Sequence, residues 1–107
     1  MKELFEAIER EEKKELTRAA ISHGSTLASP HEAFAVILEE LQEGVCSLGT
    51  AAYNLSMFWN GVRADDREKQ IERLVEIERN TLLAACEFVQ TSAMARKAMK
   101  LYEDGEK

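Results

Sequence analysis

The sequence has few chain-breaking residues, with one proline and five glycines among 107 residues. It also has no stretch in which apolar and polar residues alternate. Long helices are therefore expected, and a β-sheet is not. Cys46 and Cys86 each lie in an apolar stretch, where a cysteine is usually a small, reduced core residue, and no disulfide is expected. A glycine-rich phosphate loop, zinc-ligand spacing, and Ser-His-Asp or Cys-His sets are also missing.

Acidic residues outnumber basic ones by 20 to 14, and the resulting net charge of -6 repels nucleic-acid phosphates. The pair Lys13-Lys14 does not extend into a basic patch with aromatic residues, so no nucleic-acid partner is expected. Residues 1–10 lack the apolar core of a signal peptide, which indicates a cytoplasmic protein. Residues 44–62 are uncharged but too rich in glycine, serine and asparagine to span a membrane, and a buried helix of a soluble protein is expected there.

Three helices in one all-α domain over residues 1–107 are predicted. An amphipathic helix covers Lys2 to about Ser22 and ends at His23-Gly24. Ser29-Pro30-His31-Glu32 has the form of a capping box with proline at the first helical position, so the next helix begins there, and His31 is interpreted as a helix-start residue.

The next turn is expected within Gly61 to Asp66. Asp65 or Asp66 is the natural cap of the helix that follows. That helix can extend to Tyr102, with Gly105 just past it.

An apolar stripe marks the helix that begins at Pro30 and needs a partner along its length. Its members recur at spacings of three and four: Phe34, Ile37, Leu38, Leu41, Val45, Leu48, Ala52, Leu55 and Trp59. Gly44 and Gly49 thin this helix and permit close approach of another backbone, or break it. Residues 80–95 are apolar or small around nearly the whole circumference. Together these surfaces exceed what residues 2–22 can cover, which predicts a homodimer whose two hairpins join as a four-helix core.

A group of carboxylates lies in the same helix. Glu39, Glu40 and Glu43 can converge on one patch because they are three and four residues apart, and Glu32 lies further along that side. Such an EExxE pattern is either a solvated acidic face or a site for Mg²⁺ or Mn²⁺, which prefer carboxylate and water ligands.

Glu87 is the only charged residue between Arg79 and Arg96. With a helical rise of about 1.5 Å per residue, Glu43 lies roughly 32 Å before the turn and Glu87 roughly 35 Å after it, so the two would be nearly level in a hairpin. Glu87 shares a helix face with Gln90 in apolar surroundings. It is therefore either a buried acid hydrogen-bonded to a neighbour or a metal ligand facing the acidic patch.

Two segments resemble a known family. SPHEAFAVILEELQE (residues 29–43) and EFVQTSAMARKA (residues 87–98) are similar to MazG-like nucleoside triphosphate pyrophosphohydrolases, in particular to a short branch from phages and their bacterial hosts. The resemblance covers about residues 20–102. It implies a dimeric or tetrameric helical fold and Mg²⁺-dependent cleavage of a nucleotide between its α- and β-phosphates.

The resemblance also implies roles for individual residues. Glu40, Glu43 and Glu87 would hold Mg²⁺ (Mn²⁺ as an alternative), and Glu39 would orient or deprotonate the attacking water. Gln90 stands where the family usually has aspartate, so it would ligate the ion without contributing charge. Apart from the resemblance, Lys97, Arg63 and Arg67 are either phosphate contacts or solvated surface charges.

Two other functions fit the sequence. The replacement of aspartate by Gln90 suggests a nucleotide-binding protein without turnover on the same scaffold. The uncharged Gly44 to Val62 segment suggests an acidic helical interaction module of phage origin.

Overall fold

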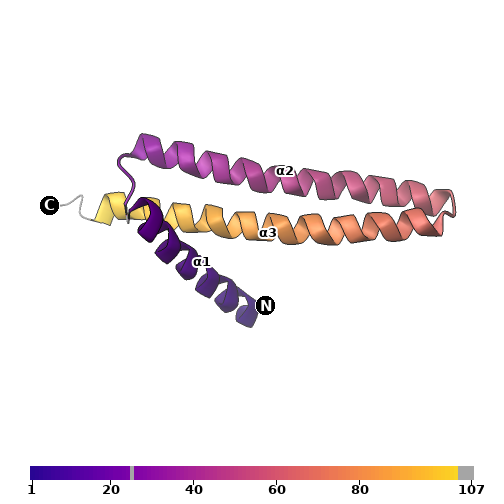
Figure 1. The fold of residues 1–107 in the computed structure, drawn as a ribbon, viewed down its shortest axis with the longest axis horizontal. Helices are drawn as coiled ribbons and strands as arrows, with labels where there is room; N and C mark the ends of the chain where they lie inside the picture. The colour runs from indigo at the N-terminus through magenta and orange to yellow at the C-terminus, as the bar shows by residue number, and fades with distance from the viewer. Residues whose placement is uncertain (25, 104–107) are drawn as a thin grey trace. The chain divides into compact units, whose positions relative to one another are not determined.

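The computed structural model describes residues 1–24 and 26–103, and this part of the chain contains three helices and no strand. Helix α1 spans Lys2–His23, α2 spans Pro30–Arg63 and α3 spans Arg67–Glu103 (Figure 1). The predicted all-α class is confirmed, and α1 and α3 each end one residue beyond the predicted position. Gly105, expected just past the last helix, lies outside the described residues.

The connection between α1 and α2 uses the predicted capping residues. Gly24 has φ 88°, a left-handed conformation that glycine adopts without steric cost, and its N–H donates to the carbonyl of Ala20 at 3.0 Å. The Glu32 N–H donates to Ser29 Oγ at 3.2 Å, and Glu32 Oε1 accepts the Ala28 N–H at 3.0 Å. The start of α2 was therefore predicted correctly.

The turn between α2 and α3 is shorter than predicted, because α2 continues through Gly61 to Arg63. Asp65 has φ 55°, and Asp66 is the cap of α3, since its Oδ1 accepts the Lys69 N–H at 3.1 Å. Neither Gly44 nor Gly49 breaks α2, whose helical hydrogen bonding is continuous across both positions.

The chain divides into two compact units. Unit 1 contains residues 1–41 and the chain from residue 87 onward, so it combines α1 with the first part of α2 and the last part of α3. Unit 2 contains residues 42–86, which form an antiparallel pair of helices on either side of the turn (Figure 1).

In unit 1, a buried carboxylate joins α1 to α3. Glu12 is 7 % exposed and accepts hydrogen bonds from the Ser92 hydroxyl and, at 2.8 Å, from Arg96 Nε. The Ser92 hydrogen bond is the largest cause that lowers the pKa of Glu12 below its usual value; the hydrogen bond and charge of Arg96 act in the same direction, while burial opposes them. The ionised form of Glu12 therefore stabilises the attachment of α1.

Replacing Glu12 with glutamine should lower the free energy of unfolding by roughly 1–3 kcal/mol near pH 7, because Ser92 and Arg96 then donate to a neutral group instead of a charged acceptor. Since the folded pKa is lowered, this stabilisation is present above the unfolded pKa and is lost as the pH falls through the folded pKa. Urea unfolding monitored by circular dichroism near pH 7 and near pH 3 would measure it. The matched control is Glu11→Gln, an exposed neighbour paired only within α1 to Lys14. Equal effects of the two substitutions near pH 7 would contradict the role of Glu12.

In unit 2, the seam between α2 and α3 is formed by small and polar side chains. Asn54 is 4 % exposed, accepts a hydrogen bond from Arg73 Nη1 at 3.0 Å and donates to the Thr50 carbonyl at 2.9 Å. Gln70 Nε2 donates to the Gly61 carbonyl at 3.3 Å, where the missing side chain of Gly61 lets α3 approach. The only buried apolar side chains of unit 2 are the alanines Ala51 and Ala84.

Two expectations about burial are wrong for the single chain. Cys46 and Cys86 are free, as predicted, but exposed, because neither position faces the seam. Residues 44–62 were expected to form a buried helix, yet Leu55 and Trp59 are 58 % and 56 % exposed. The reason is that the small residues of this segment pack against α3, whereas Leu55 and Trp59 lie on sides of α2 that face away from α3.

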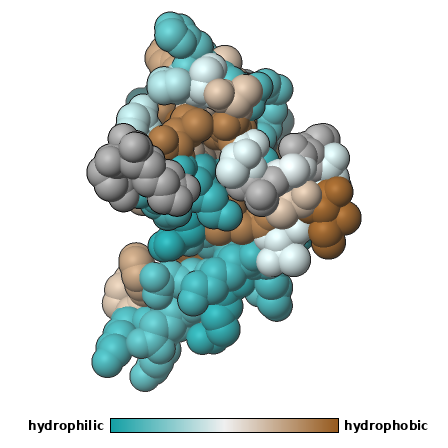
Figure 2. Space-filling view, turned by 90° about the vertical axis from the view of Figure 1, so that its left-hand side faces the viewer, coloured by the Kyte–Doolittle hydropathy of each residue, from teal (hydrophilic) through white to brown (hydrophobic). Residues whose placement is uncertain are grey.

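The apolar core of the described residues is small. It consists of Leu27, Ala33, Ala51, Ala84 and Ala93, and no large side chain among the described residues is fully buried. Figure 2 accordingly shows apolar surface open to solvent among hydrophilic side chains. No helix in the described part of the chain is both long and apolar enough to cross a membrane.

Candidate functional site

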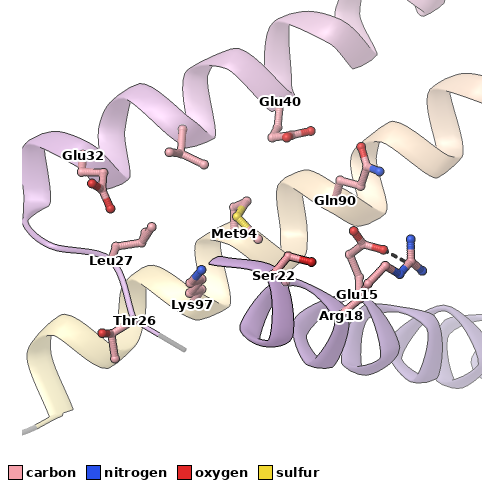
Figure 3. Close-up of a pocket in the computed structure, with 12 residues that line it drawn as sticks. Glu15, Arg18, Ser22, Thr26, Leu27, Glu32, Glu40, Gln90, Met94 and Lys97 are labelled. Atoms are coloured by element: carbon pink, nitrogen blue, oxygen red, sulfur yellow. Dashed lines mark ion pairs between the residues drawn. The ribbon is translucent and has the colours of Figure 1, made fainter. Parts of the chain in front are cut away.

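A pocket of about 510 Å³ lies in unit 1 among α1, the connection after it, α2 and α3 (Figure 3). Volumes of roughly 300–1,000 Å³ are usual for small-molecule sites. Charged and amide side chains from all three helices line this pocket: Glu15, Arg18, Glu32, Glu40, Gln90 and Lys97. The pocket therefore offers both cationic and oxygen-ligand groups to a polar small molecule.

Lys97 is the most deeply placed charge in the pocket. It is only 4 % exposed, and its ammonium group lies on the side of α3 near Leu27 and Met94 (Figure 3). Within residues 1–24 and 26–103 no carboxylate forms an ion pair with it. A lysine buried to this degree, with no ion pair to a carboxylate of the described residues, is suited to a bound phosphate or carboxylate, because an anion offsets the cost of burying its charge.

Glu40 and Gln90 belong to the same pocket and come from different helices. Glu40 projects from α2 and Gln90 from α3, and both are half-buried (Figure 3). A carboxylate and an amide oxygen are hard ligands of the kind that Mg²⁺ accepts. Glu40, Gln90 and Lys97, which sequence patterns predicted as site residues, are thus brought together by the fold.

The pocket also contains residues that the sequence patterns did not identify as site residues. Glu15 Oε2 and Arg18 Nη2 form an ion pair at 3.0 Å on α1 (Figure 3). Glu32 lines the pocket while it caps the start of α2. The only sequence signal for Glu15 and Arg18 is their spacing of three, which is common on exposed helix faces and therefore not distinctive.

The other predicted site residues do not line this pocket. Glu39 is exposed on α2, and Glu87 is half-buried on α3 within unit 1. Glu43, Arg63 and Arg67 are exposed residues of unit 2. The expected meeting of Glu43 with Glu87 involves residues of different units and stays a prediction.

The described residues contain no group of three or more aspartate, glutamate, histidine or cysteine side chains that could hold a metal ion. The described residues therefore do not form a metal site whose ligands all come from these four types of side chain. Mg²⁺ is, however, often held by one or two carboxylates together with substrate phosphates and water. Glu40 with Gln90 fits that second arrangement, in which the nucleotide supplies the remaining ligands.

The geometry on its own thus defines a pocket that contains the buried Lys97 together with the carboxylate of Glu40 and the amide of Gln90. Comparison with known proteins adds no further assignment, because no protein-family model, curated protein or solved structure matches the chain.

Proposed function

We propose that this protein is a Mg²⁺-dependent nucleoside triphosphate pyrophosphohydrolase whose unit 1 pocket binds the phosphates of the nucleotide. The observation that carries the proposal is that Glu40, Gln90 and the buried Lys97 line one pocket. These three residues also lie in the two segments that resemble MazG-like enzymes. The products would be a nucleoside monophosphate and pyrophosphate.

The pocket residues have distinct roles in this proposal. The ammonium group of Lys97 binds a phosphate oxygen and stabilises negative charge that develops there. Glu40 and Gln90 would hold Mg²⁺, which would supply positive charge to neutralise the phosphates. Glu32 and the Glu15–Arg18 pair line the remaining polar wall and orient the rest of the nucleotide.

The residues outside the pocket keep the roles that the resemblance implies. Glu39 would orient or deprotonate the attacking water. The resemblance also assigns Glu43 and Glu87 to the metal ion, in addition to the pocket residues Glu40 and Gln90. Arg63 and Arg67 are further candidate phosphate contacts. Assembly into a homodimer with a four-helix core, and a cytoplasmic location, belong to the same proposal.

The test is pyrophosphate release from a panel of nucleoside triphosphates incubated with purified protein and Mg²⁺. Release with at least one nucleotide, and its loss when EDTA removes the ion, is the expected result. Mn²⁺ should restore release because it accepts similar ligands. An absence of turnover across the panel, with either ion present, would reject the enzymatic proposal.

A second candidate function is nucleotide binding without turnover, and Gln90 is the residue that favours it. An amide contributes no charge to the ion, so a site that contains it holds Mg²⁺ more weakly than one with aspartate. Calorimetry should then detect stoichiometric nucleotide binding while pyrophosphate stays absent. Gain of pyrophosphate release in Gln90→Asp would identify the amide as the cause.

A further inference from the structure

The pocket of unit 1 has two polar ends. Gln90 and Lys97 are seven residues apart on α3, so their backbone positions are separated by roughly 10 Å along the helix, and Met94 lies between them. On α2, Glu32 lies toward the end that holds Lys97, and Glu40 lies toward the end that holds Gln90 (Figure 3). A ligand that reaches both ends is therefore elongated.

Glu15 of α1 belongs to the end of the pocket that holds Gln90 (Figure 3). Its side chain is 19 % exposed, although that of its ion-pair partner Arg18 is 70 % exposed. A pair with the same spacing on α1, Glu11 with Lys14, has both side chains largely in water, at 61 % and 69 %. The difference indicates that the carboxylate of Glu15 is turned toward the pocket, while Arg18 lies nearer to solvent.

The pocket contains more carboxylates than the metal ion requires. Glu40 is assigned to the ion, and Glu32 uses its Oε1 to accept the Ala28 N–H. Glu15 cannot bind the phosphate chain directly, because phosphate oxygens only accept hydrogen bonds and carry the same sign of charge. The groups of a nucleotide that donate hydrogen bonds are the hydroxyls of its sugar and the N–H groups of its base. Glu15 is therefore suited to the nucleoside part.

The position of Glu15 favours the sugar over the base. In the proposed reaction the bond between the α- and β-phosphates breaks, so these phosphates lie at the end of the pocket with Glu40 and Gln90. The sugar is joined directly to the α-phosphate, whereas the base lies beyond the sugar. Ribose presents adjacent 2′- and 3′-hydroxyls, which one carboxylate can accept together, and deoxyribose lacks the 2′-hydroxyl. The nearest donors to Glu15 are thus those that differ between the two sugars.

We propose that Glu15 accepts a hydrogen bond from the 2′-hydroxyl of the nucleotide and thereby selects ribonucleotides over deoxyribonucleotides. The inference rests on the proposed function, because it requires that the unit 1 pocket binds a nucleotide. The ion pair with Arg18 holds the carboxylate in place. An acidic residue recognises the ribose 2′-hydroxyl in the same way in dinucleotide-binding folds. Since the contact is to the sugar, the preference should be similar for every base.

The test compares ATP, GTP, CTP and UTP, each with its deoxyribonucleotide, in the presence of Mg²⁺. The readout is kcat/KM for pyrophosphate release; where no pyrophosphate is released, calorimetric titration gives the ratio of dissociation constants instead. The wild type should prefer the ribonucleotide by about 10- to 100-fold, the range expected for a hydrogen bond to a charged group.

Substitutions of Glu15 should reduce this preference in steps. Glu15→Gln keeps a neutral acceptor and should retain a smaller preference, whereas Glu15→Ala should treat the two sugars alike within about twofold. Alanine favours helix formation, so α1 is retained, which circular dichroism would verify. The matched control is Glu11→Ala, which removes an exposed glutamate with the same kind of ion pair and should keep the full preference.

The other outcomes separate the sugar contact from the proposed function. Pyrophosphate release at equal kcat/KM for the two sugars would overturn the sugar contact and leave the enzyme in place. A ribonucleotide preference that persists in Glu15→Ala would overturn the role of Glu15, and one confined to a single base would assign the contact to that base. Preferential binding of ribonucleotides without release would reject turnover and keep the sugar contact. Nucleotides that are neither bound nor cleaved would overturn both.

Discussion

Replacing Glu40 with glutamine is expected to lower pyrophosphate release by about 10²–10³-fold, with the loss in kcat and in kcat/KM. Glu40 is the only residue of the EExxE pattern that lines the pocket, where it faces the same space as Gln90 and Lys97. Glutamine keeps the size of the side chain and removes its charge, so the pocket would retain its shape but hold Mg²⁺ poorly. Initial rates measured over a series of Mg²⁺ concentrations would show this loss, with partial recovery at high Mg²⁺.

The matched control for Glu40 is Glu78→Gln. Glu78 is an exposed glutamate of α3 in unit 2 and does not line the pocket. Its substitution removes the same charge and should leave the rate within about twofold, because exposed charges are screened by salt. If Glu40→Gln retained wild-type rates at every Mg²⁺ concentration, the pocket would not be the site of the metal-dependent reaction.

Replacing Lys97 with methionine should weaken nucleotide binding by roughly 10- to 100-fold, since a charge-assisted contact to phosphate contributes about 1.5–3 kcal/mol. Methionine preserves most of the apolar stem of lysine, so packing around position 97 changes little. The free energy of unfolding should stay the same or rise, because the variant no longer buries a charge. Calorimetric titration with a nucleoside triphosphate and urea unfolding would measure the two effects.

Lys100 provides the comparison for Lys97, because it lies one turn later on α3 and is exposed. Lys100→Met should leave both nucleotide affinity and stability nearly unchanged. The opposite pattern for Lys97→Met, a loss of stability with unchanged nucleotide affinity, would show that Lys97 supports the fold and does not bind phosphate.

The ends of the helices could be predicted from the sequence because their causes are local. Ser29 and Glu32 cap α2 through backbone groups no more than four residues away, and Asp66 caps α3 through the N–H of Lys69. Interactions over such short separations depend on few other residues. Hence the predicted start of α2 and the cap of α3 agree with the structure.

Burial was harder to predict, because it depends on which side of a helix faces its neighbour. Apolar neighbours in the sequence suggested that Cys46 and Cys86 are core residues, but both are exposed. In the same way, Leu55 and Trp59 are exposed, although Leu55 directly follows Asn54 of the seam. Consecutive residues of a helix point in directions about 100° apart, so neighbouring residues can differ in burial. Local composition does not predict which of them is buried.

The residues of the candidate site were likewise predicted only in part. Spacing and resemblance selected Glu40, Gln90 and Lys97, and the pocket contains all three. The contribution of Glu15 and Arg18 was not predicted, because α1 reaches the pocket through a contact between residues 80 or more positions apart, that of Glu12 with Ser92 and Arg96. Contacts at such separations leave no periodic pattern in the sequence.

By itself, the sequence determined that the protein is helical and where α1, α2 and α3 begin. It also predicted which residues could bind a phosphate and a metal ion. Only the tertiary structure decided that Lys97 is buried in a pocket beside Glu40 and Gln90, and that the large apolar residues of unit 2 face outward. Helix formation depends on neighbours within one or two turns, whereas burial and pocket geometry depend on the relative rotation of helices that are distant in the chain.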